Sequence, residues 1–183
     1  MEKKRLNELV TFTIGKNITR LKGSSDMAED LYVPEDFNKD LLGINETCEG
    51  MGCVINLIKS KAAPLSVQTQ RKCITSNFLK CSFDPKKLDP KKLDPWFFCY
   101  QFNEGRYFAQ QISKYYQGNT LSVKKINIKS VGEVNIQLPD IQKQRLIGNI
   151  YRQAIRQRYL MIEQAEDIAN ATFETLRKME EDY

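Results

Sequence analysis

One uninterrupted helical pattern at the C-terminal end constrains the fold more than any other feature of this sequence. After Pro139 no proline occurs, and Gly148 is the only glycine between Pro139 and Glu181. Pro139 closes a strand-like segment and also suits the first turn of a helix. At about 1.5 Å per residue, a helix from this point to Glu181 is roughly 60 Å long. We therefore predict one long helix over residues 140–183.

Apolar and small side chains recur every three or four residues along this helix, and four of them keep a heptad spacing typical of a coiled coil. The complete stripe is Ile155, Tyr159, Ile162, Ala165, Ala169, Phe173 and Leu176. The preceding ~140 residues form a body only ~30 Å across, which is too small to cover such a helix. The helix should therefore protrude and pack against another helix.

Charge is distributed unevenly along the predicted helix. The first half carries Lys143, Arg145, Arg152, Arg156 and Arg158, whereas the second half carries Glu163, Glu166, Asp167, Glu174, Glu180, Glu181 and Asp182. Two antiparallel copies would bring the basic half of one against the acidic half of the other, in a two-fold symmetric contact. We predict a homodimer through this stripe; a solvated helix with a frayed end is the alternative.

Composition limits the kinds of chemistry available. The chain has 183 residues, a net charge of +5 and no histidine. The missing histidine excludes Ser-His-Asp and Cys-His nucleophile systems and histidine-ligated metals. The odd number of cysteines, five, favours reduced thiols, and their spacing does not indicate a metal site. We expect no catalytic residues, no metal and no cofactor on this chain.

The N-terminal segment MEKKRLNELV is charged and lacks the apolar core of a secretory signal. No stretch of the sequence approaches the ~18 apolar residues of a membrane span. We therefore expect a cytoplasmic protein that does not enter the membrane.

Residues 1–139 are predicted to form an α+β domain with mixed or antiparallel strands and short helices. The expected elements are a helix over Leu6–Val10, strands over Thr11–Ile14, Cys53–Ile58, Lys72–Phe83 and Val134–Leu138, and one or two helices from Trp96 onward. Leu121–Ile128 alternates like a strand, but could also begin as a helical turn. Residues 24–50 are polar and suggest turns.

Several loops combine basic side chains with amides and hydroxyls, which suits contacts with phosphates and base edges. They are Lys16–Lys22, Lys59–Lys61, Gln68–Lys72 and Gln117–Lys125. Composition alone selects the candidate DNA-binding residues Lys16, Asn17, Arg20, Lys61, Gln70, Arg71, Lys72 and Asn119. Solvated turns are the alternative interpretation.

The segment QGNTLSVKKINIKSVGEVNIQLPDIQKQRLIGNIYRQ resembles the end of a target recognition domain in specificity subunits of type I restriction–modification systems. The matching positions are Gln117–Thr120, Leu121, Ser122, Leu138, Pro139, Gln144 and Ile147. RLNELVTFTIGKNIT is similar to the opening of such a domain, and SNFLKCSF followed by LDPWFFCYQFN to its middle.

The resemblance implies a non-catalytic subunit that reads double-stranded DNA. Its implied partners are modification subunits, which methylate adenine with S-adenosylmethionine, and a restriction subunit can join them. Family members commonly carry two recognition domains and two spacer helices, whereas this chain has one of each, so the resemblance is to a half-length form. A homodimer of such halves would read an interrupted palindrome.

Two other functions fit parts of the sequence. A coiled-coil assembly module without a DNA role explains the helix but leaves the basic loops unexplained. A DNA-modifying enzyme is less consistent, because Asp94-Pro95-Trp96 lacks the second proline of the adenine methyltransferase motif and no Gly-x-Gly cluster follows a strand.

Overall fold

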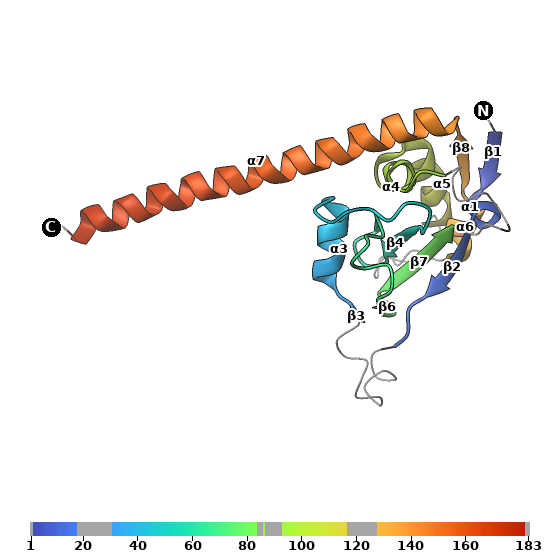
Figure 1. Cartoon of the computed structure of the whole chain (residues 1–183), viewed down its shortest axis with the longest axis horizontal. Helices are drawn as coiled ribbons and strands as arrows, with labels where there is room; N and C mark the ends of the chain where they lie inside the picture. The colour runs from blue at the N-terminus through green and yellow to red at the C-terminus, as the bar shows by residue number, and fades with distance from the viewer. Residues whose placement is uncertain (1, 18–30, 84–85, 87–92, 117–127, 182–183) are drawn as a thin grey trace.

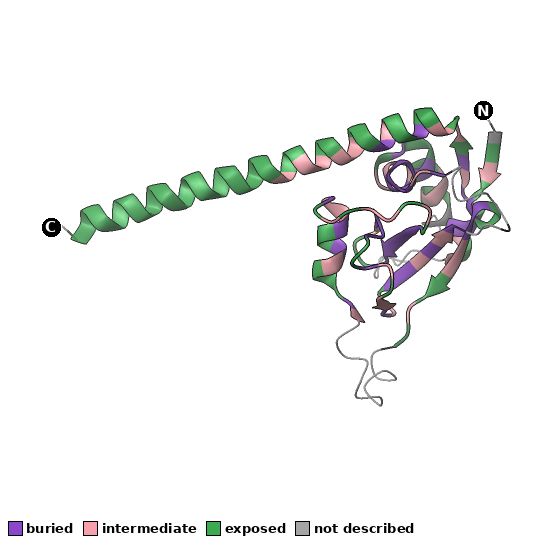
Figure 2. Ribbon diagram, viewed as in Figure 1, coloured by how far each residue is buried: buried purple, intermediate pink, exposed green. Residues whose placement is uncertain are grey.

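Helix α7 (Ile141–Glu181) lies along one side of a small body and then continues far beyond it (Figure 1). The computed structural model describes residues 2–17, 31–83, 86, 93–116 and 128–181. Figure 2 shows buried residues in the body and exposed residues along the outer part of the helix. Within the described residues, no helix combines the length and the apolar character that crossing a membrane requires.

A four-stranded antiparallel sheet forms the centre of the body. Its strand order is β2 (Val10–Ile14), β7 (Phe78–Phe83), β4 (Cys53–Asn56) and β5 (Lys61–Pro64). In its register Val10 lies opposite Phe83, and Cys53 lies opposite both Cys81 and Pro64. All residues of β4 are buried, as expected for a central strand with both faces covered.

Two smaller strand pairs flank this sheet. One is antiparallel and pairs the first strand of the chain with the last, whereas the other is parallel and lies at the end of the body farthest from α7. The flanking elements are β1 (Glu2–Arg5), α1 (Leu6–Leu9), β3 (Leu31–Tyr32), α3 (Pro34–Leu41), β6 (Cys73–Ile74), α6 (Ile128–Glu133) and β8 (Asn135–Leu138). β1 pairs with β8, and β3 pairs with β6.

Helix α4 (Pro95–Glu104) lies between the sheet and α7, and α5 (Arg106–Tyr116) follows it directly. The α4 side chains Phe97, Phe98 and Cys99 are buried in the same cluster as Ile55 and Leu79 of the sheet. Because α4 is covered by the sheet and by α7, most of its residues are buried. It is therefore the element through which α7 is attached to the body.

The predicted α+β fold with antiparallel strands and a long C-terminal helix is confirmed. Two local predictions were wrong: the single strand over Lys72–Phe83 and the turns at residues 34–41. Lys72–Phe83 forms two strands, since Phe78 N–H donates to Thr75 O (2.9 Å) and closes a turn between them. The segment Leu121–Ile128 fitted either a strand or the start of a helix; Ile128 begins helix α6, and residues 121–127 lie outside the described residues. Residues 34–41 form α3, where Pro34 opens the helix and Val33 N–H donates to Asp36 Oδ2 (3.0 Å).

Candidate nucleic-acid interface

The end of the body farthest from α7 brings together two of the segments expected to contact DNA (Figure 1). Lys16 follows β2 and forms a parallel bridge with Thr75, just after β6. Its N–H donates to Ile74 O (3.0 Å), and its carbonyl accepts from Ser76 N–H (3.0 Å). A side chain on Gly15 would collide with the Thr75 backbone, so glycine permits this close approach. Lys16 and Asn17 are exposed there.

The Gln68–Lys72 turn is anchored on its buried side by the carboxylate of Asp40 in α3, which is 2% exposed. Thr69 Oγ1 donates to Asp40 Oδ2 (2.7 Å), and Tyr32 Oη donates to the same oxygen (3.0 Å). Burial raises the pKa of Asp40, while hydrogen bonds from neighbouring side chains, first Thr69, oppose this rise. Since the Asp40 carboxylate and the hydroxyls of Thr69 and Tyr32 are hydrogen-bonded to one another inside the body, this network fixes the shape of the turn.

Within the turn the predicted residues differ in their contacts. Arg71 is exposed. Gln70 is half-buried, and its Oε1 accepts from Cys48 Sγ (3.2 Å). Lys72 Nζ forms an ion pair with Asp36 at 2.9 Å, with both side chains largely buried (25% and 15% exposed). Lys72 therefore connects the turn to α3, and Arg71 is the cation best placed to meet a phosphate.

The remaining candidates do not join this group. Lys61 opens β5 on the side facing α7, where its Nζ pairs with Glu104 (2.8 Å) and donates to Asn103 O (3.0 Å). Arg20 and Asn119 lie outside the described residues. The structure thus brings Lys16 and Asn17 to the same end as the Gln68–Lys72 turn and places Lys61 elsewhere.

Lys80 is a cation near the turn that sequence reasoning missed. It lies in β7 opposite Thr13, and its Nζ donates to Gln70 O (3.2 Å). The available signal was the alternation of Leu79, Lys80 and Cys81, which turns Lys80 away from the two buried side chains. It was not among the predicted residues because that prediction rested on the composition of loops.

The first turns of α7 are attached to α4 by a buried amide. Gln144 is 1% exposed; its Nε2 donates to Pro139 O (2.8 Å), and its Oε1 accepts from Asp94 N–H (3.1 Å). Asp94 caps α4 by accepting from Phe97 N–H (2.7 Å). One turn further along, a Cβ on Gly148 would lie 2.9 Å from Phe97 N. These contacts fix the direction in which α7 leaves the body.

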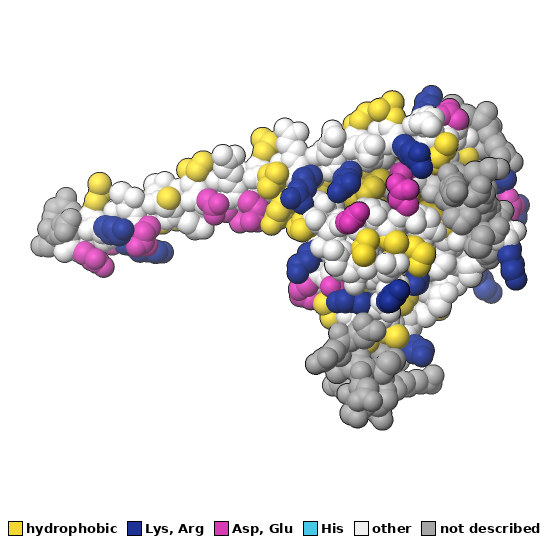
Figure 3. Space-filling view, in the orientation of Figure 1, with side chains coloured by type: hydrophobic (Ala, Val, Ile, Leu, Met, Phe, Trp, Pro, Cys, Tyr) yellow, Lys and Arg dark blue, Asp and Glu magenta, His cyan; other side chains and the backbone are white. Residues whose placement is uncertain are grey.

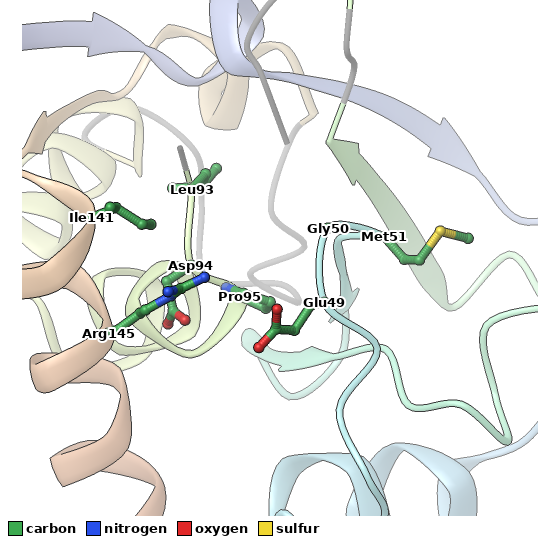
Figure 4. Close-up of a pocket in the computed structure, with 8 residues that line it drawn as sticks. All are labelled: Glu49, Gly50, Met51, Leu93, Asp94, Pro95, Ile141 and Arg145. Atoms are coloured by element: carbon green, nitrogen blue, oxygen red, sulfur yellow. The ribbon is translucent and has the colours of Figure 1, made fainter. Parts of the chain in front are cut away.

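A hollow of about 410 Å³ opens beside this junction, between Glu49–Met51, Leu93–Pro95 and the start of α7 (Figure 4). The Arg145 side chain extends toward Asp94 there. Burial raises the pKa of Asp94, opposed by backbone N–H groups at Phe97 and Trp96 and by the charge of Arg145. Asp94 is a helix cap, and none of the described residues forms a group of three or more metal-binding side chains.

The stripe predicted to pair with another helix divides between two environments. Ile155 and Tyr159 are half-buried where α7 leaves the body. Farther out Ile162, Phe173 and Leu176 are 46%, 56% and 51% exposed, and Ala165 and Ala169 are also exposed. Every described residue from Leu160 to Glu181 is exposed. The geometry thus leaves a long apolar stripe uncovered in the single chain.

Comparison with known proteins gives a similarity at the level of the fold. No protein-family model matches the chain, and no curated protein matches it. Among solved structures, the chain is similar to the HsdS subunit from Thermoanaerobacter tengcongensis, with a TM-score of 0.50 and 14% sequence identity. The similarity covers 90% of this chain and 39% of that one. It is therefore a likeness of fold, and the chain spans well under half the length of that subunit.

Proposed function

We propose that this chain is a DNA-recognition subunit of a type I restriction–modification system. The body reads one half of a bipartite site, and α7 holds the two reading bodies apart. The observation that carries the proposal is the combination of a small α+β body with a projecting 41-residue helix, which is similar to an HsdS subunit over 90% of this chain. The sequence resemblance described above points independently to the same family.

The DNA-reading surface is the end of the body that presents Lys16, Asn17 and the Gln68–Lys72 turn. Arg71 and Lys16 are exposed cations suited to phosphates, and Asn17 carries an amide suited to base edges. The Gln70 amide is hydrogen-bonded to Cys48 and Val67 and would have to exchange these bonds to contact a base. The turn is held rigidly by Asp40 and by the Lys72–Asp36 ion pair. A rigid support of this kind lowers the entropy cost of ordering the surface when it binds.

Helix α7 pairs antiparallel with α7 of a second copy through the exposed stripe. Covering apolar side chains that are about half exposed in the single chain provides the driving force. The two-fold symmetry would place one body at each end of the helix pair, so the two half-sites form an interrupted palindrome. The helix pair then sets the distance between the half-sites.

Methylation is performed by separate modification subunits that bind S-adenosylmethionine, with a restriction subunit as a further partner of the complex. This chain supplies recognition and positioning. Its buried acids have structural roles, since Asp40 accepts hydrogen bonds from Thr69 and Tyr32, and Asp94 caps α4.

Selection from a pool of random DNA duplexes tests recognition. The purified chain is incubated with the pool, bound duplexes are recovered and sequenced, and affinity for the enriched duplex is measured at several salt concentrations. We expect an interrupted palindrome and an affinity that falls steeply with salt, because phosphate contacts release counterions. An unenriched pool with salt-independent binding would contradict the proposal and favour a coiled-coil assembly module.

A matched pair of arginine variants locates the reading surface. Arg71→Ala is expected to weaken binding to the enriched duplex about fivefold, because one phosphate contact is lost. Arg106→Ala removes an equal charge at the start of α5, away from the turn, and should leave the affinity unchanged. Equal effects of the two variants would show that the Gln68–Lys72 turn is not the contact. Titration with S-adenosylmethionine should give no binding heat; saturable binding would indicate the enzyme alternative.

A further inference from the structure

We propose that the C-terminal end of α7 from the second copy docks in the groove between α7 and the C-terminal end of α3. This inference rests on the proposed pairing of α7. It adds that the dimer contact includes the body as well as the two helices. The groove is defined by Leu41, Leu42, Tyr151, Ile155, Tyr159 and Ile162 and is called the wedge groove below.

The wedge groove lies where α7 separates from the body, and its volume is about 260 Å³. Apolar side chains from both elements form its walls, and the Lys61–Glu104 ion pair (2.8 Å) lies at its edge. Figure 3 shows hydrophobic side chains gathered where the free part of the helix meets the body. A groove open to solvent and lined in this way is suited to an apolar helix end.

The exposed stripe of α7 leads directly into this groove. Tyr151 and Ile155 face the body and line the groove, and seven residues beyond Ile155 the stripe continues at Ile162, on the same side of the helix. A partner helix on this stripe therefore lies in line with the wedge groove. Because the pairing is antiparallel, it is the C-terminal end of the partner that points toward the groove.

The heptad pattern fixes the register of this pairing. Ile155, Ile162, Ala169 and Leu176 occupy one core position, and Tyr159, Glu166, Phe173 and Glu180 occupy the other. We place the two-fold axis between Asp167 and Ile168. Tyr159 then faces Leu176 of the second copy, and Ile162 faces Phe173 of the second copy. The small Ala169 faces Glu166 of the second copy beside the axis, where the helices approach most closely.

Shifting the partner by one heptad loses these apolar layers. An outward shift places Ile162 opposite Glu180 and Leu176 opposite Glu166. An inward shift places Leu176 opposite Arg152, whose guanidinium lies over the Trp96 ring (5.8 Å to its centroid). Of these three registers, only the proposed one pairs Tyr159, Ile162, Phe173 and Leu176 with one another.

Charge at the groove fits the end of helix that it receives. In the proposed register Glu180 of the second copy lies opposite Ile155, close to Arg158 and Lys61, which both line the wedge groove. An acidic helix end is thereby brought to a groove whose charged lining residues are Arg158 and the Lys61–Glu104 ion pair, so Arg158 is the cation without an acidic partner in the groove lining. Opposite charges favour this orientation over a parallel pairing, which would bring acidic end against acidic end.

Docking at the wedge groove would also support the DNA-reading turn. Leu41 and Leu42 end α3, and the same helix holds the turn through the Asp36–Lys72 ion pair and the Asp40–Thr69 hydrogen bond. A partner pressed against Leu42 therefore restrains the element that carries the turn. In this arrangement each copy stabilises the reading surface of the other.

Cross-linking tests the register in the full-length chain. The half-exposed Cys48 and Cys73 are first changed to serine. Tyr159→Cys with Leu176→Cys should then give a covalent dimer on mild oxidation, because the two positions face each other between copies. Tyr159→Cys with Lys178→Cys is the matched control; Lys178 lies two residues from Leu176, about 200° further around the helix, so its thiol faces away from the second copy.

A pair of substitutions outside α7 tests the contact with the body. Leu42→Glu places a charge in the wedge groove and should raise the dimer dissociation constant at least about tenfold, as for an apolar contact of roughly 1.4 kcal/mol. Ile44→Glu is the matched control, because Ile44 lies two residues away and lines the hollow beside Arg152 and Arg156 instead. Sedimentation equilibrium gives both constants, and circular dichroism checks that each variant is folded.

The outcomes separate this inference from the proposed function. A dimer that cross-links through the 159–176 pair and is weakened by Leu42→Glu alone is the expected result. A dimer whose dissociation constant is unchanged by Leu42→Glu, or that cross-links only through the control pair, overturns docking in the wedge groove and leaves α7 pairing intact. A monomeric wild-type chain that still selects a DNA sequence overturns both the pairing and the docking, but not DNA recognition.

Discussion

The inner and outer parts of α7 belong to one continuous helix but differ in what stabilises them. From Ile141 to Tyr159 the helix lies on α4 and the neighbouring body, and two of its residues, Gln144 and Gly148, are buried. From Leu160 to Glu181 every residue is exposed. Since helical stability in proteins comes mostly from packing of an apolar face, the inner part is stabilised within the chain, whereas the outer part has no such packing against the described residues of the body.

The contacts of the inner part are polar and specific as well as apolar. Tyr151 packs edge-on against Trp96, with ring centroids 6.4 Å apart, and its hydroxyl accepts from Asn103 Nδ2 (2.9 Å). Burial raises the pKa of Tyr151, so the hydroxyl stays protonated. Among the described residues, the outer part shows one ion pair, between Arg177 and Glu174 of the same helix. Such an exposed pair contributes little to stability.

The largest effect is expected from a variant that disrupts the contact between the inner part of α7 and α4. Gly148→Leu forces a side chain against Trp96 Cβ and Phe97 N, where even a Cβ would lie only 2.9 Å away from each. We expect the free energy of unfolding to fall by about 3 kcal/mol, as for severe overpacking. Urea denaturation measures this value. Asn149→Leu, on the adjacent exposed position, should stay within about 0.5 kcal/mol of the wild type; an equal loss there would mean that close approach at Gly148 is not the cause.

The next effect concerns the outer part alone. Phe173→Asp places a charge in the exposed stripe and should weaken the proposed dimer about a hundredfold, because roughly 2–3 kcal/mol of apolar burial is lost. Ile168→Asp is the matched control, since Ile168 is also exposed (63%) but lies off the stripe. Light scattering over a range of concentrations measures both. A dimer equally weakened by the two variants would place the contact on a different face of α7.

A smaller effect is expected from a variant that removes the buried amide of Gln144 in the inner part. Gln144→Leu keeps a similar volume but leaves Pro139 O and Asp94 N–H without their partner. We expect unfolding to become easier by about 2 kcal/mol, the usual cost of unsatisfied buried groups. Gln142→Leu, on an exposed position of the same turn, serves as the control in urea denaturation. An unchanged Gln144→Leu variant would mean that apolar packing alone holds the inner part.

The sequence predicted α7 because its signal is local. The absence of proline after Pro139 and the recurrence of apolar residues at helical spacing are visible along a single stretch of chain. The position of Gln144 was identified through the family resemblance. Its hydrogen bond to Asp94 could not be predicted, since the two residues are distant in the sequence and meet only when α7 packs on α4.

The candidate site was harder to predict for the same reason. Composition selects cations but does not show which of them have acidic partners within the fold. Lys72 and Lys61 met the same criterion as Arg71, yet they pair with Asp36 and Glu104, which come from distant elements. The α3 helix was missed because its apolar face is short and its N-terminal side chains, Pro34 to Asp36, also suit a turn.

The smallest predicted effect lies within the inner part of α7. Arg152 is half-buried, with its guanidinium over the Trp96 ring at 5.8 Å from the centroid. Arg152→Gln removes this cation–π contact and should lower the free energy of unfolding by about 0.5–1 kcal/mol. Lys143→Gln removes the same charge from an exposed inner position and should change stability by less than about 0.5 kcal/mol in the same urea titration. Equal losses would assign the effect to net charge. A loss confined to Arg152→Gln would show that packing on the body extends outward at least to Arg152. This residue lies one turn before the start of the stripe that we assign to the second copy.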